Sequence, residues 1–184
     1  MMEYQSIRSD RKTLSIEVRG TQVIVRAPGR ISQQRIDSFV AEHETWMKKK
    51  IAKNVEESRK ADQAGILSEE ELKALYRKAK EVIPQRTAYY AEKIGVTYGK
   101  ITIRCQKTKW GSCSAKGNLN FNCLLMMAPP EVLDSIVVHE LCHRREMNHS
   151  RRFYEEIYRV FPDYARWNKW LKENGGVLMA RIPG

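Results

Sequence analysis

Two histidines four positions apart, His139 and His143, form the centre of the segment VHELCHRREMNHS. On an α-helix, this spacing places both imidazoles on one face, one turn apart. That is the arrangement that two nitrogen ligands of a single zinc ion require. Glu140 follows the first histidine directly, so its carboxylate can accept a proton from a water that the metal has acidified. The residue types and their spacing therefore predict a hydrolytic metal site with Glu140 as the general base.

A third histidine, His149, lies shortly downstream, and the chain has only four histidines. Ser150 is a good N-cap, so His149 would stand in the turn between two helices and serve as a third ligand. The carboxylates of Glu155 and Glu156 are alternative third ligands, although imidazole suits zinc better. Three protein ligands would leave the fourth position of one Zn²⁺ per chain open for water, as catalytic sites require.

The helix that carries the motif is expected to start at Pro129 and Pro130, because proline is favoured at the first helical position. Apolar residues at helical spacing indicate that one face of this helix is buried. These residues are Val132, Leu133, Ile136, Val137 and Leu141. The motif thus sits on a half-buried helix.

A short strand over Ile101–Arg104 and a hairpin are expected before this helix. The hairpin would place Lys109–Ser114 on one strand and turn at Lys116–Asn118. On the returning strand, Leu119 and Phe121 alternate with asparagines, which predicts one apolar and one polar face.

Two interpretations of the first hairpin strand remain open. In one, Trp110 and Cys113 belong to the core and Gly111 marks a bulge. In the other, the strand is an edge beside the metal helix that holds an extended substrate. The candidate substrate-binding residues are then Trp110, Gly111, Ser112 and Cys113.

Residues 1–64 are expected to form an N-terminal β-hairpin and helix, packed as one compact unit with a metallohydrolase domain over residues 65–184. Alternating apolar residues over Thr13–Val18 and Val23–Val25 predict the hairpin. Ser32 can cap a single helix that continues to Ile51. The polar run Asn54–Gln63 is the candidate linker.

Helix boundaries in the remaining chain follow from capping residues and prolines. Ser68 and Glu71 form a capping box, and Gly95 suits the end of that helix. Pro84 is expected to kink or divide it. A last helix would open at Pro162 and close at Gly175-Gly176. The isolated His43 is expected to be packed or exposed rather than a ligand.

Composition is typical of a globular protein, with 184 residues, 42% hydrophobic and 30% charged. The first residues contain no apolar run, so no signal peptide is expected, and the sequence has no Cys-x-x-Cys pair and no run of ~20 apolar residues. We therefore expect a cytoplasmic protein with reduced thiols and no membrane partner. The net charge of +11 favours acidic partners, including nucleic acid or another polyanion, unless it only solvates the surface.

Four segments occur in order at short spacings, namely Trp110–Ser114, Val138–His143, Asn148–Ser150 and Phe161–Tyr164. Together they resemble the YgjP-like metallopeptidase family, which is related to SprT-like and minimal zincin proteases. The resemblance implies an α+β fold with a zincin-like core: a small antiparallel sheet, an active-site HExxH helix and supporting helices. It implies zinc on His139, His143 and His149, with Glu140 as general base.

These observations favour a zinc-dependent peptidase acting on a peptide or protein substrate. Tyr154 or Tyr158 on the following helix could stabilise the oxyanion. One alternative is a metal-dependent nucleotide (UTP-type) pyrophosphatase, an activity proposed for some members of the resembled family. A second is a zinc-stabilised nucleic-acid-binding module, for which Cys142 is the only nearby candidate for a fourth ligand.

Overall fold

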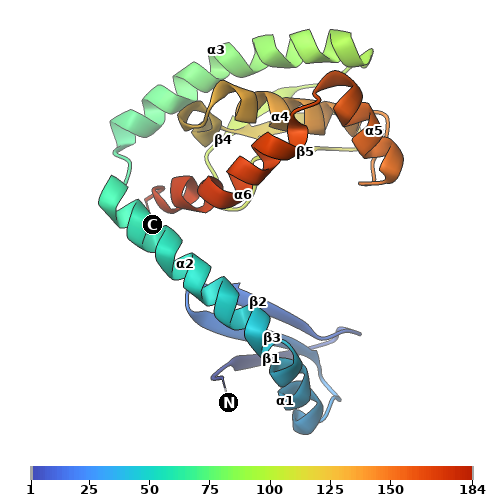
Figure 1. Ribbon diagram of the computed structural model, residues 1–184. Coiled ribbons are helices and arrows are strands. Elements are labelled where there is room, and N and C mark those ends of the chain that lie inside the picture. Colours follow the sequence, from blue (N-terminus) through green and yellow to red (C-terminus); the bar gives the residue numbers. More distant parts are fainter. Residues whose placement is uncertain (1, 184) are drawn as a thin grey trace. The chain divides into compact units, whose positions relative to one another are not determined.

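The computed structural model describes residues 2–183, which adopt an α+β fold (Figure 1). The chain divides into two compact units, with the boundary between Lys60 and Ala61. Each unit has its own cluster of buried apolar side chains. None of the helices in residues 2–183 is long and apolar enough to cross a bilayer.

The N-terminal unit contains a three-stranded sheet in the order β1-β3-β2. Its elements are β1 (Gln5–Ser9), β2 (Ser15–Arg19), β3 (Gln22–Pro28), α1 (Gln33–Glu42) and most of α2 (Glu44–Ala64), up to Lys60. β2 and β3 pair antiparallel, as the hairpin prediction requires, and β1 adds a parallel strand on the other side of β3. The strand β1 was not predicted, because its sequence QSIRS has a single apolar residue and no alternation.

The helix predicted from Ser32 to Ile51 is in fact two helices. Ser32 caps α1 as expected, but α1 ends at His43, whose backbone leaves the helical region with φ −105° and ψ 6°. The His43 ring nitrogen Nδ1 contacts the carbonyl oxygen of Phe39 at 2.8 Å, one turn back. Local capping of the first helix therefore interrupts an otherwise continuous apolar pattern.

The boundary between the two units falls within the linker predicted over Asn54–Gln63, but this run is not a loop, because α2 stays helical to Ala64. Its polar residues have good helix propensity and form ion pairs at helical spacing. Lys53 lies 3.5 Å from Glu57, and Glu56 pairs with Arg59 at 2.9 Å. The polar residues of Asn54–Gln63 therefore indicate an exposed helix rather than a loop.

The C-terminal unit contains a second three-stranded sheet, in the order β4-β6-β5. Its elements are the rest of α2, then α3 (Glu69–Ile94), β4 (Ile101–Arg104), β5 (Gly111–Cys113), β6 (Leu119–Asn122), a 3₁₀ turn (Cys123–Met127), α4 (Pro130–Cys142), α5 (Arg151–Val160) and α6 (Tyr164–Ala180). β5 and β6 form the hairpin, but β4 runs parallel to β6. The expected antiparallel sheet is therefore mixed, because β4 joins the side of β6 that β5 leaves free.

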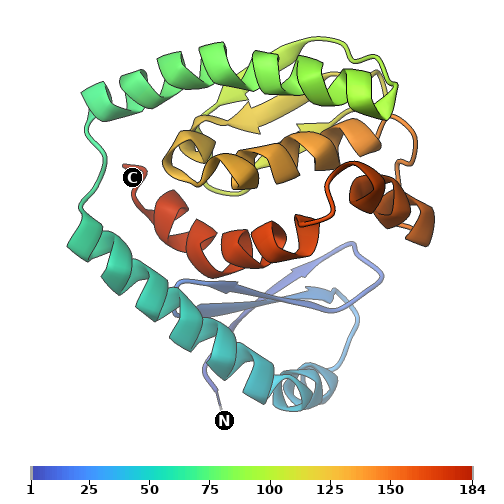
Figure 2. The ribbon, with the colours of Figure 1, turned by 45° about the horizontal axis from the view of Figure 1, so that its top comes forward.

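Helix α4 is the central element of the C-terminal unit. It packs against α3, α5, α6 and β5, and Figures 1 and 2 show it between α3 and α6. Val137, Val138, Leu141 and Cys142 are completely buried. A helix that is apolar on nearly every side is held rigidly by its neighbours, so α4 can position side chains accurately.

Helix α3 begins with the predicted capping box of Ser68 and Glu71 and ends at Gly95, which has a left-handed backbone with φ 74°. Pro84 does not divide it, since α3 continues from Glu69 to Ile94. An interior proline costs ~3 kcal/mol. The buried face of α3, which includes Ile83 and packs on α4, offsets this cost.

The predicted end of α6 at Gly175-Gly176 is also wrong, because the helix continues to Ala180. Gly175 is buried, and a Cβ atom there would lie 3.0 Å from Cζ2 of Trp110. The lack of a side chain at Gly175 therefore lets Trp110 pack closely against α6, and this glycine does not cap the helix.

Candidate metal centre

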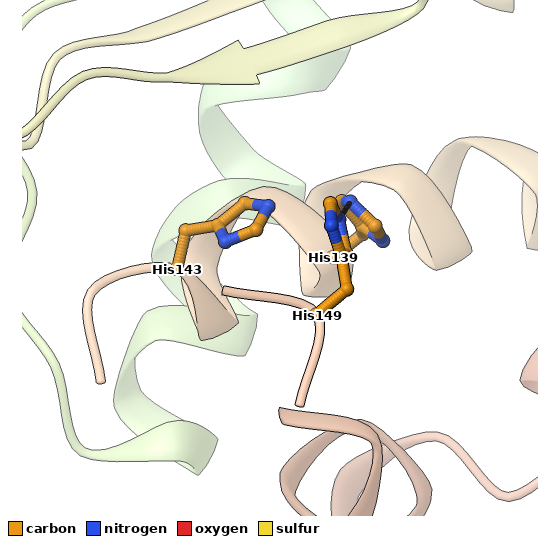
Figure 3. A group of neighbouring side chains, drawn as sticks. All are labelled: His139, His143 and His149. Atoms are coloured by element: carbon orange, nitrogen blue, oxygen red, sulfur yellow. Dashed lines mark hydrogen bonds between the residues drawn. The ribbon is translucent and has the colours of Figure 1, made fainter. Parts of the chain in front are cut away.

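Three histidine side chains converge at the C-terminal end of α4 (Figure 3). His139 lies in the last turn of α4, and His143 is the residue that caps this helix. His149 lies just before Ser150, whose hydroxyl caps α5 by accepting a hydrogen bond from the amide of Phe153. One helix and one interhelical turn thus carry the cluster.

The donor atoms of the three histidines all lie within 4.8 Å of one another, close enough to hold one metal ion. Nε2 of His149 is 3.1 Å from Nε2 of His139. The three pairs of ring centroids are 4.9–5.0 Å apart. A set of three imidazoles suits zinc and other transition metals better than magnesium or calcium, which prefer oxygen ligands.

The other ring nitrogens of two histidines have protein partners. Nδ1 of His139 lies 2.9 Å from the hydroxyl of Tyr164, and Nδ1 of His143 lies 3.1 Å from the carbonyl oxygen of Glu146. If each Nδ1–H donates to its oxygen, each Nε2 keeps a free lone pair. Such outer contacts commonly fix the orientation and tautomer of metal-binding histidines.

Phe153 packs against the rings of all three histidines. Its ring centroid lies 4.6–5.0 Å from those of all three histidines, and its side chain is completely buried. The contacts of Phe153 and Tyr164 with the histidines were not predicted from the sequence. The only sequence signals were the position of Phe153 next to the cap of α5 and the inclusion of Tyr164 in the segment FPDY.

Burial controls the protonation of the site. Burial lowers the pKa of His139 to about 4, with further lowering from His143 and His149, and it also lowers the pKa of His143. Neutral imidazole is the form that binds a metal. Burial raises the pKa of Glu140 to about 8, which the positive charge of Lys109 partly opposes.

Strand β5 approaches Glu140 at Gly111. A Cβ atom on Gly111 would lie 2.6 Å from Oε1 and 2.8 Å from Cγ of Glu140, closer than real Cβ atoms come to other atoms. Only glycine allows the strand to pass the carboxylate at this distance. The close approach places an edge strand of the sheet beside Glu140.

The other predicted substrate-binding residues have different surroundings. Trp110 is half-buried and packs near Gly175 of α6. The hydroxyl of Ser112 accepts a hydrogen bond from the amide of Asn120 across the hairpin, at 3.2 Å. Burial and the charge of Glu140 raise the pKa of Cys113. Gly111 and Cys113 are thus the two of these positions that interact with Glu140.

The candidate oxyanion residues and the alternative ligands lie on α5. Tyr154 is 38% exposed and its ring centroid lies 6.5 Å from that of His149, whereas Tyr158 is 42% exposed and contacts the ring of Tyr164 instead. The carboxylates of Glu155 and Glu156 lie outside the histidine group and form ion pairs, at 2.8 Å with Arg151 and at 2.7 Å with Arg145.

A family comparison accounts for this arrangement. The model of the YgjP-like metallopeptidase domain matches residues 12–74 and 56–174, two overlapping stretches that together span most of the chain. The chain belongs to the YgjP-like family. Membership makes it a metallopeptidase-type hydrolase, which uses a metal cofactor and acts on peptide or protein substrates.

Two solved structures are similar to part of this YgjP-like chain. The metallopeptidase zymogen abylysin from Pyrococcus abyssi shares 22% identity, with a TM-score of 0.45, over 50% of this chain and 94% of its own. The zymogen jannalysin from Methanocaldococcus jannaschii shares 21% identity with the same TM-score and coverage. No curated protein sequence matches the chain.

Tyr164→Phe in this YgjP-like protein is expected to weaken metal binding by about 10- to 100-fold, the usual cost of losing an outer partner of a metal-binding histidine. The substitution removes the hydroxyl that contacts Nδ1 of His139 and keeps the buried ring. Competition with a chromogenic chelator measures the affinity. Tyr158→Phe is the matched control, and equal affinities of the two variants would contradict the role of Tyr164.

Proposed function

We propose that this protein is a zinc-dependent peptidase whose metal is held by His139, His143 and His149. The observation that carries the proposal is the convergence of three imidazole donors within 4.8 Å, beside a buried glutamate. Three protein ligands leave one position of a tetrahedral ion open, which distinguishes a catalytic zinc site from a structural one. The C-terminal unit would then be a zincin-like core, with α4 as its active-site helix.

Glu140 is the proposed general base. When bound, zinc supplies Lewis-acid chemistry, because it acidifies water and polarises a carbonyl group. Glu140 then accepts a proton from the attacking water and returns it to the leaving amine. Its burial supports this role, since a raised pKa lets a carboxyl group both hold and release a proton near neutral pH.

The proposed substrate-binding element is β5, which forms the edge of its sheet. An extended peptide can add to such an edge through backbone hydrogen bonds. Gly111 would bring the scissile bond close to Glu140, because a Cβ atom on Gly111 would lie only 2.6 Å from Oε1 of Glu140. Tyr154 is preferred over Tyr158 as the oxyanion partner, because its ring contacts that of His149.

Gly111→Ala is expected to lower kcat/KM toward peptides by about 100-fold, the cost of displacing a catalytic group by ~1 Å. The added Cβ would collide with Oε1 and Cγ of Glu140, and the buried side chain must shift. The zinc content should stay unchanged. Gly29→Ala is the control, since a Cβ there meets nothing within 4 Å. Full activity of Gly111→Ala would refute the proposed path of the substrate along β5.

The function is tested with an unbiased peptide library, and UTP is supplied to the same enzyme in parallel. We expect peptide cleavage that disappears with a chelator and returns with zinc, while UTP stays intact. Release of pyrophosphate from UTP without peptide cleavage would support the nucleotide pyrophosphatase instead. Binding of nucleic acid without hydrolysis of either substrate would support the zinc-stabilised binding module.

A further inference from the structure

Two cysteines stand at the carboxyl ends of neighbouring parallel strands, away from the histidine cluster. Cys105 directly follows β4, and Cys123 directly follows β6. The last residues of these strands, Arg104 and Asn122, are Cα partners in the ladder. Neighbouring strands are ~4.7–4.9 Å apart, which falls within the Cα separation of ~4.4–6.8 Å that a disulfide requires.

The side chains of the two cysteines also meet. Burial raises the pKa of the Cys123 thiol, and the neighbouring Cys105 side chain raises it further. Cys105 is exposed, whereas Cys123 is completely buried. Both line a cavity of about 350 Å³ against α3, with Leu72 and Tyr76 on its wall. One of the two cysteines is therefore exposed and the other buried, at the same cavity.

The remaining cysteines are placed differently. The thiol of Cys113 on β5 contacts the carbonyl oxygen of Ser114 at 3.5 Å. Cys142 is completely buried in α4, and the charged groups that influence its thiol are Glu156, Arg159 and Arg145. Neither has a thiol neighbour among the interactions found in residues 2–183. The pairing is thus specific to Cys105 and Cys123.

We propose that Cys105 and Cys123 are a redox modification site, at which a peroxide converts the two thiols into a reversible intramolecular disulfide. The exposed Cys105 sulfur attacks hydrogen peroxide, the O–O bond breaks, and a sulfenic acid and one water form. The Cys123 sulfur then attacks the sulfenic sulfur, the S–O bond breaks, and a second water leaves. The two thiols lose two electrons and two protons in total, and peroxide is reduced to two waters.

The disulfide would join the ends of β4 and β6. Cys105 directly precedes the segment 106–110, which leads into β5. The side chain of Asn122, next to Cys123, already holds this segment by donating to the carbonyl oxygens of Gln106 at 2.7 Å and Lys109 at 3.0 Å. Oxidation would add a covalent restraint to these hydrogen bonds. We therefore expect slower amide hydrogen exchange over residues 106–110 in the oxidised protein.

The full-length reduced protein is treated with graded hydrogen peroxide, alkylated with N-ethylmaleimide and analysed by intact mass and peptide mapping without reductant. The expected product has lost two hydrogen atoms, has two fewer alkylated thiols and contains a Cys105–Cys123 cross-linked peptide. Dithiothreitol should restore both alkylation sites. Cys105→Ser and Cys123→Ser should each abolish the product, and Cys113→Ser should leave it unchanged.

Cys105 is exposed, so Cys105→Ser keeps the test valid even if replacement of the buried Cys123 unfolds the chain. The proposal is overturned if Cys105 accumulates as sulfinic acid, if it links two chains, or if it bridges to Cys113. The readout requires no enzymatic activity, so it is independent of the proposed peptidase function.

Discussion

Replacement of Glu140 by glutamine is expected to lower kcat/KM toward peptides by about 10²- to 10⁴-fold, the usual contribution of a general acid–base group. Glutamine has nearly the same shape but cannot accept the proton of the attacking water. The three histidines are unchanged, so the zinc content should equal that of the wild type. Peptide hydrolysis and metal analysis on the same preparation measure both quantities.

Stability provides a further check on Glu140→Gln. Burial raises the pKa of Glu140 from 4.5 to about 8, so in the metal-free folded protein the carboxyl is mainly protonated at pH 7, while it ionises on unfolding. The folded state therefore loses stability through this group as pH rises from about 4.5 to about 8. A neutral amide removes that loss, so the metal-free variant should unfold at a higher temperature than the wild type at pH 7.

Glu131→Gln is the matched control for this variant, because Glu131 lies exposed in the first turn of the same helix. It should keep full activity. If Glu140→Gln hydrolyses peptides as fast as Glu131→Gln, Glu140 is not the base. A Glu140→Gln variant that has lost its zinc would show instead that the substitution disturbs the ligands.

The second large effect is expected for His149→Ala, which should lose zinc. Removal of a ligand must cost more affinity than the ~10- to 100-fold caused by removal of an outer partner. His149 is exposed and precedes the cap of α5, so its loss should leave the fold intact. The zinc content after gel filtration, together with a circular dichroism spectrum, measures both outcomes.

His43→Ala is the control for His149→Ala, since His43 is the one remaining histidine and lies at the end of α1 in the N-terminal unit. It should retain one zinc per chain. Glu155→Gln and Glu156→Gln test the alternative carboxylate ligands. If either glutamate variant loses zinc while His149→Ala keeps it, the third ligand is that glutamate on α5 and not His149.

Local patterns in the sequence were sufficient for several elements. The four-residue spacing of His139 and His143 brings two rings to one helix face, because the α-helix repeats every 3.6 residues. The capping box of Ser68 and Glu71 and the left-handed Gly95 are likewise local, since each concerns hydrogen bonds within a few residues. Local polarity does not distinguish a loop from an exposed helix at Asn54–Gln63, where helix propensity and ion pairs keep α2 helical.

Contacts between distant segments depended on the tertiary structure. Tyr164 meets His139 across 25 positions, and Gly111 meets Glu140 from another strand. The parallel pairing of β4 with β6 also follows from packing around α4 and not from alternation within either strand. Sequence periodicity tells which face of an element is buried but not which element buries it. The sequence by itself therefore determined the three histidines and the glutamate of the candidate metal site, while only the fold decided which residues contact them.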